Sequence, residues 1–191
     1  MGRYGVASRA LVQLAVEFPA LFNPMMVELL EAPAETLVTV PETEMPLTCV
    51  LWRVAQDRSE ELKLRLARIW NTKDVETLFR QTCCHKLVVH AEMQLINFYD
   101  HNQPLKPTFR FTGVSKKSCY LSHMFLTTHP ESFCVSSCHQ KLYLTWIPPP
   151  AVGPKMYRRY KTLTTELSKV MEATARQALE GRMGIRGSQS P

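Results

Sequence analysis

Three residues in the second half of the chain carry side chains that could together bind a metal ion and move a proton. His90 and Glu92 form a His-Ala-Glu triplet at the start of a predicted helix, and Cys119 lies at the start of another. Side chains in a helix lean toward its N-terminus, so residues of a first turn can reach past the helix end. Imidazole and thiolate are zinc ligands, and a nearby carboxylate that is not a ligand can transfer protons. Each signal alone is weak, because a His-x-Glu triplet often arises by chance at a surface helix start, and a lone cysteine is more often a small core residue than a ligand.

The residues around Cys119 favour its thiolate form, which is the form that binds metal. Ser118 is expected to cap the helix, and Lys116 and Lys117 precede it. A helix N-terminus and neighbouring positive charge both favour a thiolate. Between the two helix starts the pattern predicts one strand, Thr108–Gly113, so both starts should lie at the same end of a sheet, where α/β domains usually have their sites.

The second half of the chain alternates between helix and strand patterns. Helices are predicted over Val88–Tyr99 and Ser118–Thr127. Strands are predicted over Thr108–Gly113, Phe133–Val135 and Lys141–Trp146, the first and last of which alternate apolar and polar residues. This order predicts an α/β domain.

A long amphipathic helix is predicted after Pro148–Pro150. Its apolar stripe consists of Tyr160, Leu163, Leu167, Val170, Met171 and Ala178. The segment Ala151–Pro191 contains eight Lys and Arg against three Glu, and it accounts for most of the net charge of +6. A basic helix fits an anionic partner such as nucleic acid, although a solvated helix face has the same composition.

The first part of the chain is predicted to be mainly helical. Helices are expected over Ala7–Phe18, from Asp57 through Ile69, and from Lys73 to about Thr82. Two β-like runs, Thr36–Val40 and Leu47–Arg53, could pair as a hairpin. We therefore expect an N-terminal helical region packed on the core, a core domain, and a basic amphipathic helix with a flexible tail, spanning residues 1–86, 87–150 and 151–191.

The composition is that of one ordinary folded domain with a helical extension. The chain has 191 residues, of which 45% are hydrophobic and 21% charged. No apolar run has the length of a membrane span, and Ala10–Val16, interrupted by Gln13, fits a helix start better than a secretory signal. Six cysteines without such a signal indicate reduced thiols. We expect a cytoplasmic or nuclear location and no membrane association, and nothing here indicates protein partners.

Part of the second half resembles a known family. The resemblance lies in Val89–Leu95, Gly113–Leu121, His139–Tyr143 and Trp146. The family is nucleic-acid/nucleotide deaminase-like, abundant in fungi and related to bacterial toxin deaminases. The resemblance covers roughly Val89–Pro149, and its most specific part is the Ser-Lys-Lys-Ser-Cys string that ends at Cys119.

This resemblance implies a cytidine-deaminase-like three-layer fold, in which a mixed sheet is flanked by helices. It also implies hydrolytic deamination, in which zinc-activated water attacks an amino-bearing ring carbon. His90 and Cys119 are then zinc ligands, and Glu92 is the catalytic proton shuttle. The partner is a base-containing substrate, which could be a nucleobase, a nucleoside, a nucleotide or a nucleic acid.

The sequence departs from the family at one position. The family uses C-x-x-C, and here Ser122 stands where the second cysteine is expected. A serine hydroxyl is a poor zinc ligand beside a thiolate. His123 projects from nearly the same helix face as Cys119 and could complete a His/Cys/His site, since zinc catalysis needs three protein ligands and an open position. The alternative is that His123 packs or faces solvent.

Other candidate residues carry weaker signals. His139 and Lys141 lie in the family-like segment where the last predicted strand begins, and they could bind substrate or simply occupy a loop. A second, structural zinc site would lack the usual C-x2-C pair, so ordinary thiols are the preferred interpretation of the residues it would use. Those residues are Cys83, Cys84, His85, Cys134, Cys138 and His139.

Three functions are compatible with these patterns. The leading one is zinc-dependent hydrolytic deamination. The second is a catalytically inactive deaminase-like domain that serves as a binding or scaffold module, because Ser122 replaces the third ligand. The third is nucleic-acid binding through the basic C-terminal helix.

Overall fold

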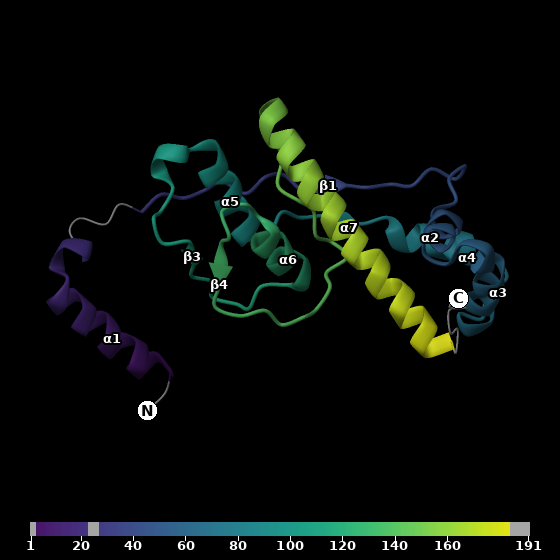
Figure 1. The fold of residues 1–191 in the computed structure, drawn as a ribbon, viewed down its shortest axis with the longest axis horizontal. Coiled ribbons are helices and arrows are strands. Elements are labelled where there is room, and N and C mark those ends of the chain that lie inside the picture. The colour runs from purple at the N-terminus through teal and green to yellow at the C-terminus, as the bar shows by residue number, and fades with distance from the viewer. Residues whose placement is uncertain (1–2, 23–26, 184–191) are drawn as a thin grey trace, which may run out of the picture. The chain divides into compact units, whose positions relative to one another are not determined.

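The structure is a computed structural model that describes residues 3–22 and 27–183, and it is mostly helical (Figure 1). The chain divides into two compact units, one up to Glu31 and one from Ala32 onward. The first unit contains helix α1 (Arg3–Glu17) and the short 3-10 helix η1 (Pro19–Phe22). The helix predicted over Ala7–Phe18 is confirmed, and it ends before Pro19 because proline disfavours helical geometry in the residue before it.

The site-bearing part of the second unit is α/β. Helices α5 (Ala91–His101) and α6 (Tyr120–Thr128) alternate with β3 (Phe111–Thr112) and β4 (Cys134–Val135), which pair in parallel. The 3-10 helix η3 (Gln103–Leu105) follows α5. The predicted alternation of helix and strand is therefore present, although the strands are shorter than expected.

The predicted long C-terminal helix is confirmed as α7 (Gly153–Met183), and it is part of the core. One cluster of buried residues joins three helices, with Met93 and Ile96 from α5, Phe125 from α6, and Tyr160 and Leu163 from α7. The N-terminal part of the α7 stripe thus packs on the α5–α6 pair (Figure 1). The flexible tail expected after this helix lies outside the described residues.

Two small sheets take the place of one continuous sheet in the described residues. In addition to the β3–β4 pair, β1 (Thr36–Leu37) pairs antiparallel with β2 (Lys86–Leu87). Isolated parallel bridges join Val88 to Trp146 and Ser118 to Cys138.

The strand predicted over Lys141–Trp146 is wrong. Its backbone turns, and Trp146 N donates to Tyr143 O at 3.2 Å, so only Trp146 forms a bridge. Leu142 and Leu144, which would share one face of that strand, are 50% and 71% exposed. The alternation of apolar residues here reflects a turn and not a pleated strand.

The hairpin predicted between Thr36–Val40 and Leu47–Arg53 is also wrong, because the second run lies in helix α2 (Pro46–Ala55). Pro46 suits the first position of a helix. Glu76 then accepts hydrogen bonds from Leu47 N at 2.8 Å and Thr48 N at 3.1 Å, which satisfies donors that a helix start leaves free. This cap comes from a distant segment.

Helix α2 belongs to a second, helical cluster. The expected helices are present as α3 (Ser59–Ile69), after the 3-10 helix η2 (Gln56–Arg58), and as α4 (Val75–Cys83), whose start Asp74 caps. The buried core of this cluster consists of Leu47, Leu51, Leu62 and Val75, with Leu179 of α7 packed against it. The early part of α7 therefore packs on α5 and α6, and its later part packs on the helical cluster.

No helix in the described residues is both long and apolar enough to cross a bilayer.

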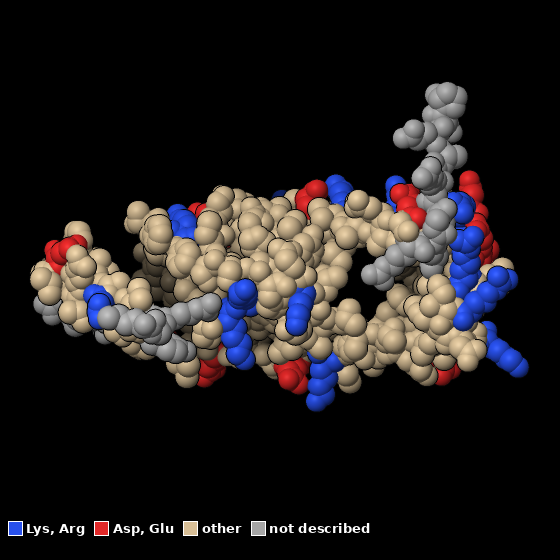
Figure 2. Space-filling view, turned by 90° about the horizontal axis from the view of Figure 1, so that it is seen from below, with Lys and Arg blue, Asp and Glu red and all other residues tan. Residues whose placement is uncertain are grey.

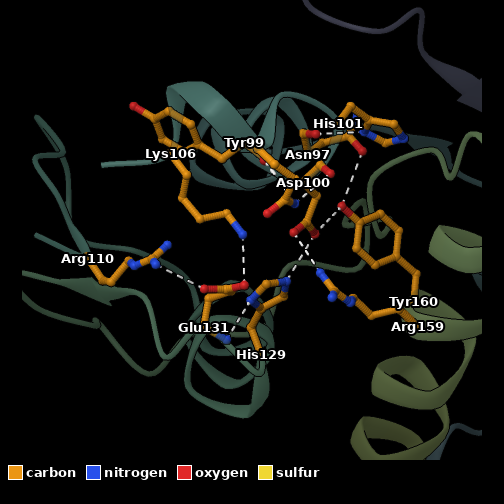
Figure 3. Close-up of polar contacts among 11 residues, drawn as sticks. Asn97, Tyr99, Asp100, His101, Lys106, Arg110, His129, Glu131, Arg159 and Tyr160 are labelled. Atoms are coloured by element: carbon orange, nitrogen blue, oxygen red, sulfur yellow. Dashed lines mark hydrogen bonds and ion pairs between the residues drawn. The ribbon is translucent and has the colours of Figure 1, made fainter. Parts of the chain in front are cut away.

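A buried ionic network joins the C-terminal ends of α5 and α6 to α7 (Figure 3). The Asp100 carboxylate contacts His129 Nε2 at 3.0 Å, Arg159 Nη1 at 2.9 Å and the Tyr160 hydroxyl at 2.9 Å. Burial would raise the pKa of Asp100, but its contacts with His129, Tyr160 and Arg159 outweigh this effect and lower that pKa. Beside this network, Glu131 pairs with Lys106 and Arg110. We define the Asp100–His129–Arg159–Tyr160 set as the anchor network.

Candidate active site

His90 lies immediately before α5, as its N-cap residue. Its backbone is extended, and its carbonyl accepts hydrogen bonds from Met93 N and Gln94 N at 2.9 and 3.0 Å. The helix begins at Ala91, three residues later than the sequence pattern predicts. Glu92 therefore lies in the first turn, and both side chains are at the same helix end.

Cys119 is the N-cap residue of α6, although the sequence pattern predicts Ser118 in that role. Cys119 Sγ accepts a hydrogen bond from Ser122 N at 3.3 Å. Ser118 is instead paired with Cys138 in a β-bridge, and its hydroxyl donates to Ser137 O at 3.2 Å. The bridge fixes Ser118 in the β-region, so the helix begins one residue later and the thiol itself takes the capping position.

The three sequence-predicted site residues meet at one point. One ligand atom from each of His90, Glu92 and Cys119 lies within 4.8 Å of the others, and this is the only such group of three or more His, Cys, Asp or Glu in the described part of the chain. Cys119 Sγ is 3.4 Å from His90 Nδ1, and Glu92 Oε1 is 3.9 Å from the same nitrogen. The cysteines and histidines of the alternative zinc site form no such group in that part of the chain.

The electrostatics of the pair favour charge separation. The hydrogen bond with Cys119 raises the pKa of His90 against the effect of burial, and the charges of Cys119 and Glu92 add to it. Burial would raise the pKa of Cys119, but its hydrogen bonds with His90 and Ser122 lower that pKa overall. The thiolate form that a metal needs is therefore stabilised by the fold.

Ser122 faces the cluster and His123 does not join it. Ser122 Oγ lies 3.3 Å from both Cys119 Sγ and His90 Nδ1. The half-buried His123 is outside the group of close ligand atoms, and within the described residues its Nδ1 is buried without a hydrogen-bond partner. The residue three positions after an N-cap faces back toward the capping side chain, whereas the next residue is turned further around the helix. Capping geometry is the signal that the sequence interpretation missed.

A cavity of about 740 Å³ opens beside the cluster. It is lined by His90, Ala91, Glu92, residues 113–117, Cys119, His139 and Tyr143. His139, one of the two residues predicted to bind substrate, thus lies in the cavity wall. Lys141 is exposed and is not part of the lining. Tyr143, which sequence reasoning did not select, contacts the rings of both His90 and His139 edge-on, with centroids 5.8 and 5.5 Å apart.

A comparison with known protein families matches the part of the chain that contains this site. Residues 89–150 match a family model described as OTT_1508_deam-like deaminase. This segment is deaminase-like. It contains α5, α6, the β3–β4 pair and every residue of the cavity lining. No curated protein and no solved structure shows a significant match to the chain.

Proposed function

We propose that the protein is a zinc-dependent hydrolytic deaminase of a base, acting on a nucleobase, nucleoside, nucleotide or nucleic acid. The observation that carries the proposal is the meeting of His90, Glu92 and Cys119 beside a cavity, inside the deaminase-like segment. We further propose that residues 87–150 form a reduced cytidine-deaminase-like core, with α5 and α6 as its site-bearing helices, residues 1–86 as an N-terminal region and 151–191 as a C-terminal extension.

The donor set is suited to zinc. His90 Nδ1 and Cys119 Sγ are zinc-binding atoms, and their separation of 3.4 Å is that of two ligands on one ion. These two residues would hold the metal, which supplies Lewis acidity that lowers the pKa of water. Hydrogen bonding already favours the thiolate of Cys119, and metal binding would release the proton that the same hydrogen bond favours on His90.

Glu92 is suited to proton transfer. It is largely buried, and within the described residues its carboxylate accepts no hydrogen bond that would compete for a proton. In the proposed reaction the oxygen of water forms a bond to the amino-bearing ring carbon, and the carbon–nitrogen bond breaks. Glu92 accepts a proton from water and returns one to the leaving amine, which departs as ammonia.

The cavity walls supply the remaining roles. Tyr143 stands beside His90 and offers an aromatic surface for a base, and His139 is packed against Tyr143. A base bound between these rings and Glu92 would present its ring carbon to the metal site. Lys141 keeps a role only if the substrate extends beyond the cavity.

Ammonia release is the direct test. Full-length protein loaded with Zn²⁺ is incubated with cytosine- and adenine-type bases, nucleosides, nucleotides and single-stranded oligonucleotides. We expect release with at least one class of substrate, lost in His90→Ala and retained in His101→Ala, an exposed histidine at the opposite end of α5. A wild type that holds zinc and releases no ammonia from any substrate would overturn the proposal.

The inactive binding module is a second candidate, favoured by Ser122 in place of the third zinc-binding cysteine. It predicts that ligands bind in the cavity without turnover.

Nucleic-acid binding through α7 has less support. Arg159 is paired with Asp100, Lys169 with Glu166, and Arg176 donates to Val54 O. Figure 2 shows Lys and Arg interspersed with acidic and neutral side chains on the visible face of the second unit.

A further inference from the structure

Three donor atoms at the starts of α5 and α6 form a nearly equilateral triangle. His90 Nδ1 and Cys119 Sγ are 3.4 Å apart, and each lies 3.3 Å from Ser122 Oγ. With metal–ligand bonds of about 2.0–2.3 Å, tetrahedral coordination separates neighbouring donor atoms by about 3.3–3.7 Å. The triangle therefore has the dimensions of one face of a zinc tetrahedron, and its third vertex is a hydroxyl.

The Ser122 hydroxyl makes no hydrogen bond to the helix backbone in the described residues. The side chain is fully buried. A serine inside a helix commonly returns its hydroxyl to a backbone carbonyl one turn earlier, but in the described residues Ser122 Oγ contacts only Cys119, His90 and Trp146. The hydroxyl is held in the site by side chains alone.

Trp146 fixes how this hydroxyl is oriented. The indole Nε1–H donates to Ser122 Oγ at 3.1 Å, and an indole nitrogen can only donate, so the serine oxygen is the acceptor. The oxygen keeps one lone pair and its own hydrogen on the side of the other two contacts. The bridge to Val88 and the ring contact with Phe125, at 6.2 Å between centroids, hold the indole in place.

We propose that the Ser122 hydroxyl, oriented by the Trp146 indole, is the third protein ligand of a His-Cys-Ser cation site. This inference rests on the proposed metal-dependent function and specifies its ligand set. The oxygen binds as a neutral donor, so His90, Cys119 and Ser122 together contribute one negative charge where a second cysteine would make it two. The site binds zinc less tightly than a His-Cys-Cys site, and it leaves more positive charge on the ion for the fourth position.

Metal affinity of the full-length protein tests the ligand set without requiring turnover. Zn²⁺ affinity is measured by competition with a chromogenic chelator for the wild type, Ser122→Ala, Ser122→Cys, Trp146→Phe and His123→Ala. We expect at least a tenfold loss in Ser122→Ala, a severalfold loss in Trp146→Phe and no change in His123→Ala. Ser122→Cys should bind at least tenfold more tightly than the wild type. Circular dichroism verifies that each variant is folded. If Trp146→Phe does not fold, the affinity of Ser122→Ala decides the result.

Cobalt provides a spectroscopic count of the thiolates. Co²⁺-loaded wild type should show tetrahedral d–d bands and a thiolate-to-metal charge-transfer band of one cysteine, and Ser122→Cys should show about twice that charge-transfer intensity. Unchanged affinity in Ser122→Ala, or loss of metal in His123→Ala, overturns the inference and leaves the deaminase proposal standing. Metal binding by Ser122→Cys but not by the wild type also overturns the inference. If neither the wild type nor Ser122→Cys binds metal, both this inference and the proposed zinc-dependent function are overturned.

Discussion

Helices α5 and α6 have a cluster of polar side chains around one histidine at each end of the pair. The two clusters differ in how many of their hydrogen-bonding atoms already have partners. At the N-terminal ends, His90 lies 3.4 Å from Cys119 Sγ beside a cavity. At the C-terminal ends, His129 lies 3.0 Å from Asp100 in the anchor network, where neither side chain is exposed. Both clusters pair an imidazole with an acidic group, so residue types alone do not distinguish them.

Hydrogen-bond capacity does distinguish them. In the anchor network, His129 Nδ1 accepts from Glu131 N at 3.2 Å, so Nε2 carries the proton that it donates to Asp100. Arg159 and Tyr160 also donate to the Asp100 carboxylate, so both of its oxygens accept hydrogen bonds. At the other end, the Glu92 carboxylate lines the cavity and accepts no hydrogen bond within the described residues. A filled network stabilises a fold, whereas unfilled capacity at a cavity can bind and react.

The helix dipoles add to this contrast. The positive N-terminal end of α6 favours the thiolate of Cys119, which is the N-cap residue of that helix. Asp100 lies near the negative C-terminal end of α5, where a carboxylate is disfavoured and requires the positive charge of Arg159. The cation on α7 is therefore part of what makes the buried anion tolerable.

The largest expected effect is on catalysis. Glu92→Gln should lower turnover by about 10²–10⁴-fold, because the amide cannot take a proton from water. Zinc content and the midpoint of thermal unfolding should stay at wild-type values. Ammonia release, elemental analysis and calorimetry measure the three quantities. If this variant loses its metal, Glu92 is a ligand and not a proton shuttle.

The next effect is on stability. Asp100→Asn should lower the free energy of unfolding by about 3 kcal/mol, because it leaves Arg159 without its counter-charge in a partly buried position. Urea unfolding measures the change, and Zn²⁺ affinity of the folded variant should be unaffected. The exposed pair Lys169–Glu166, also on α7, is the matched control, and Lys169→Ala should change stability by less than about 1 kcal/mol. Equal effects of the two substitutions would contradict the anchoring role.

A smaller change separates charge from hydrogen bonding in the same network. Tyr160→Phe keeps the ring that packs on Phe125, with centroids 5.6 Å apart, and removes only the hydroxyl that donates to Asp100. The expected loss is about 2 kcal/mol of unfolding free energy, typical of one hydrogen bond to a charged group. A loss as large as that in Asp100→Asn would show that the hydroxyl, and not the ion pair, dominates the network.

The last prediction concerns how the stability contributed by the same network depends on pH. This dependence has no effect at neutral pH and appears only in acid. The pKa of Asp100 is lowered in the folded protein, so the unfolded chain binds its proton first as pH falls. Its stabilisation should be complete above the ordinary value of 3.8 and should be lost as pH falls through the lower folded-state pKa. Asp100→Asn should therefore flatten the acid limb of stability against pH. An unchanged acid limb in the variant would assign acid sensitivity to other carboxylates.

The sequence was sufficient where chemistry and local spacing carry the information. The His-Ala-Glu triplet and the Ser-Lys-Lys-Ser-Cys string locate the cluster, and apolar periodicity locates α1, α3, α4 and α7. Local patterns also place His90 and Cys119 at helix starts, to within a few residues. Helix periodicity depends on neighbours within one turn, which a sequence shows directly.

Tertiary structure decided the rest, because the deciding partners are distant in sequence. The run Leu47–Arg53 has a β-like pattern but lies in helix α2, whose first turn is stabilised by a hydrogen bond from Leu47 N to Glu76. The bridge between Ser118 and Cys138 makes Cys119 the cap, and this in turn directs Ser122 rather than His123 toward His90. Each of these outcomes depends on a hydrogen bond or bridge made across the fold. The sequence by itself therefore determined which side chains could do the chemistry, and only long-range contacts decided which of them face one another.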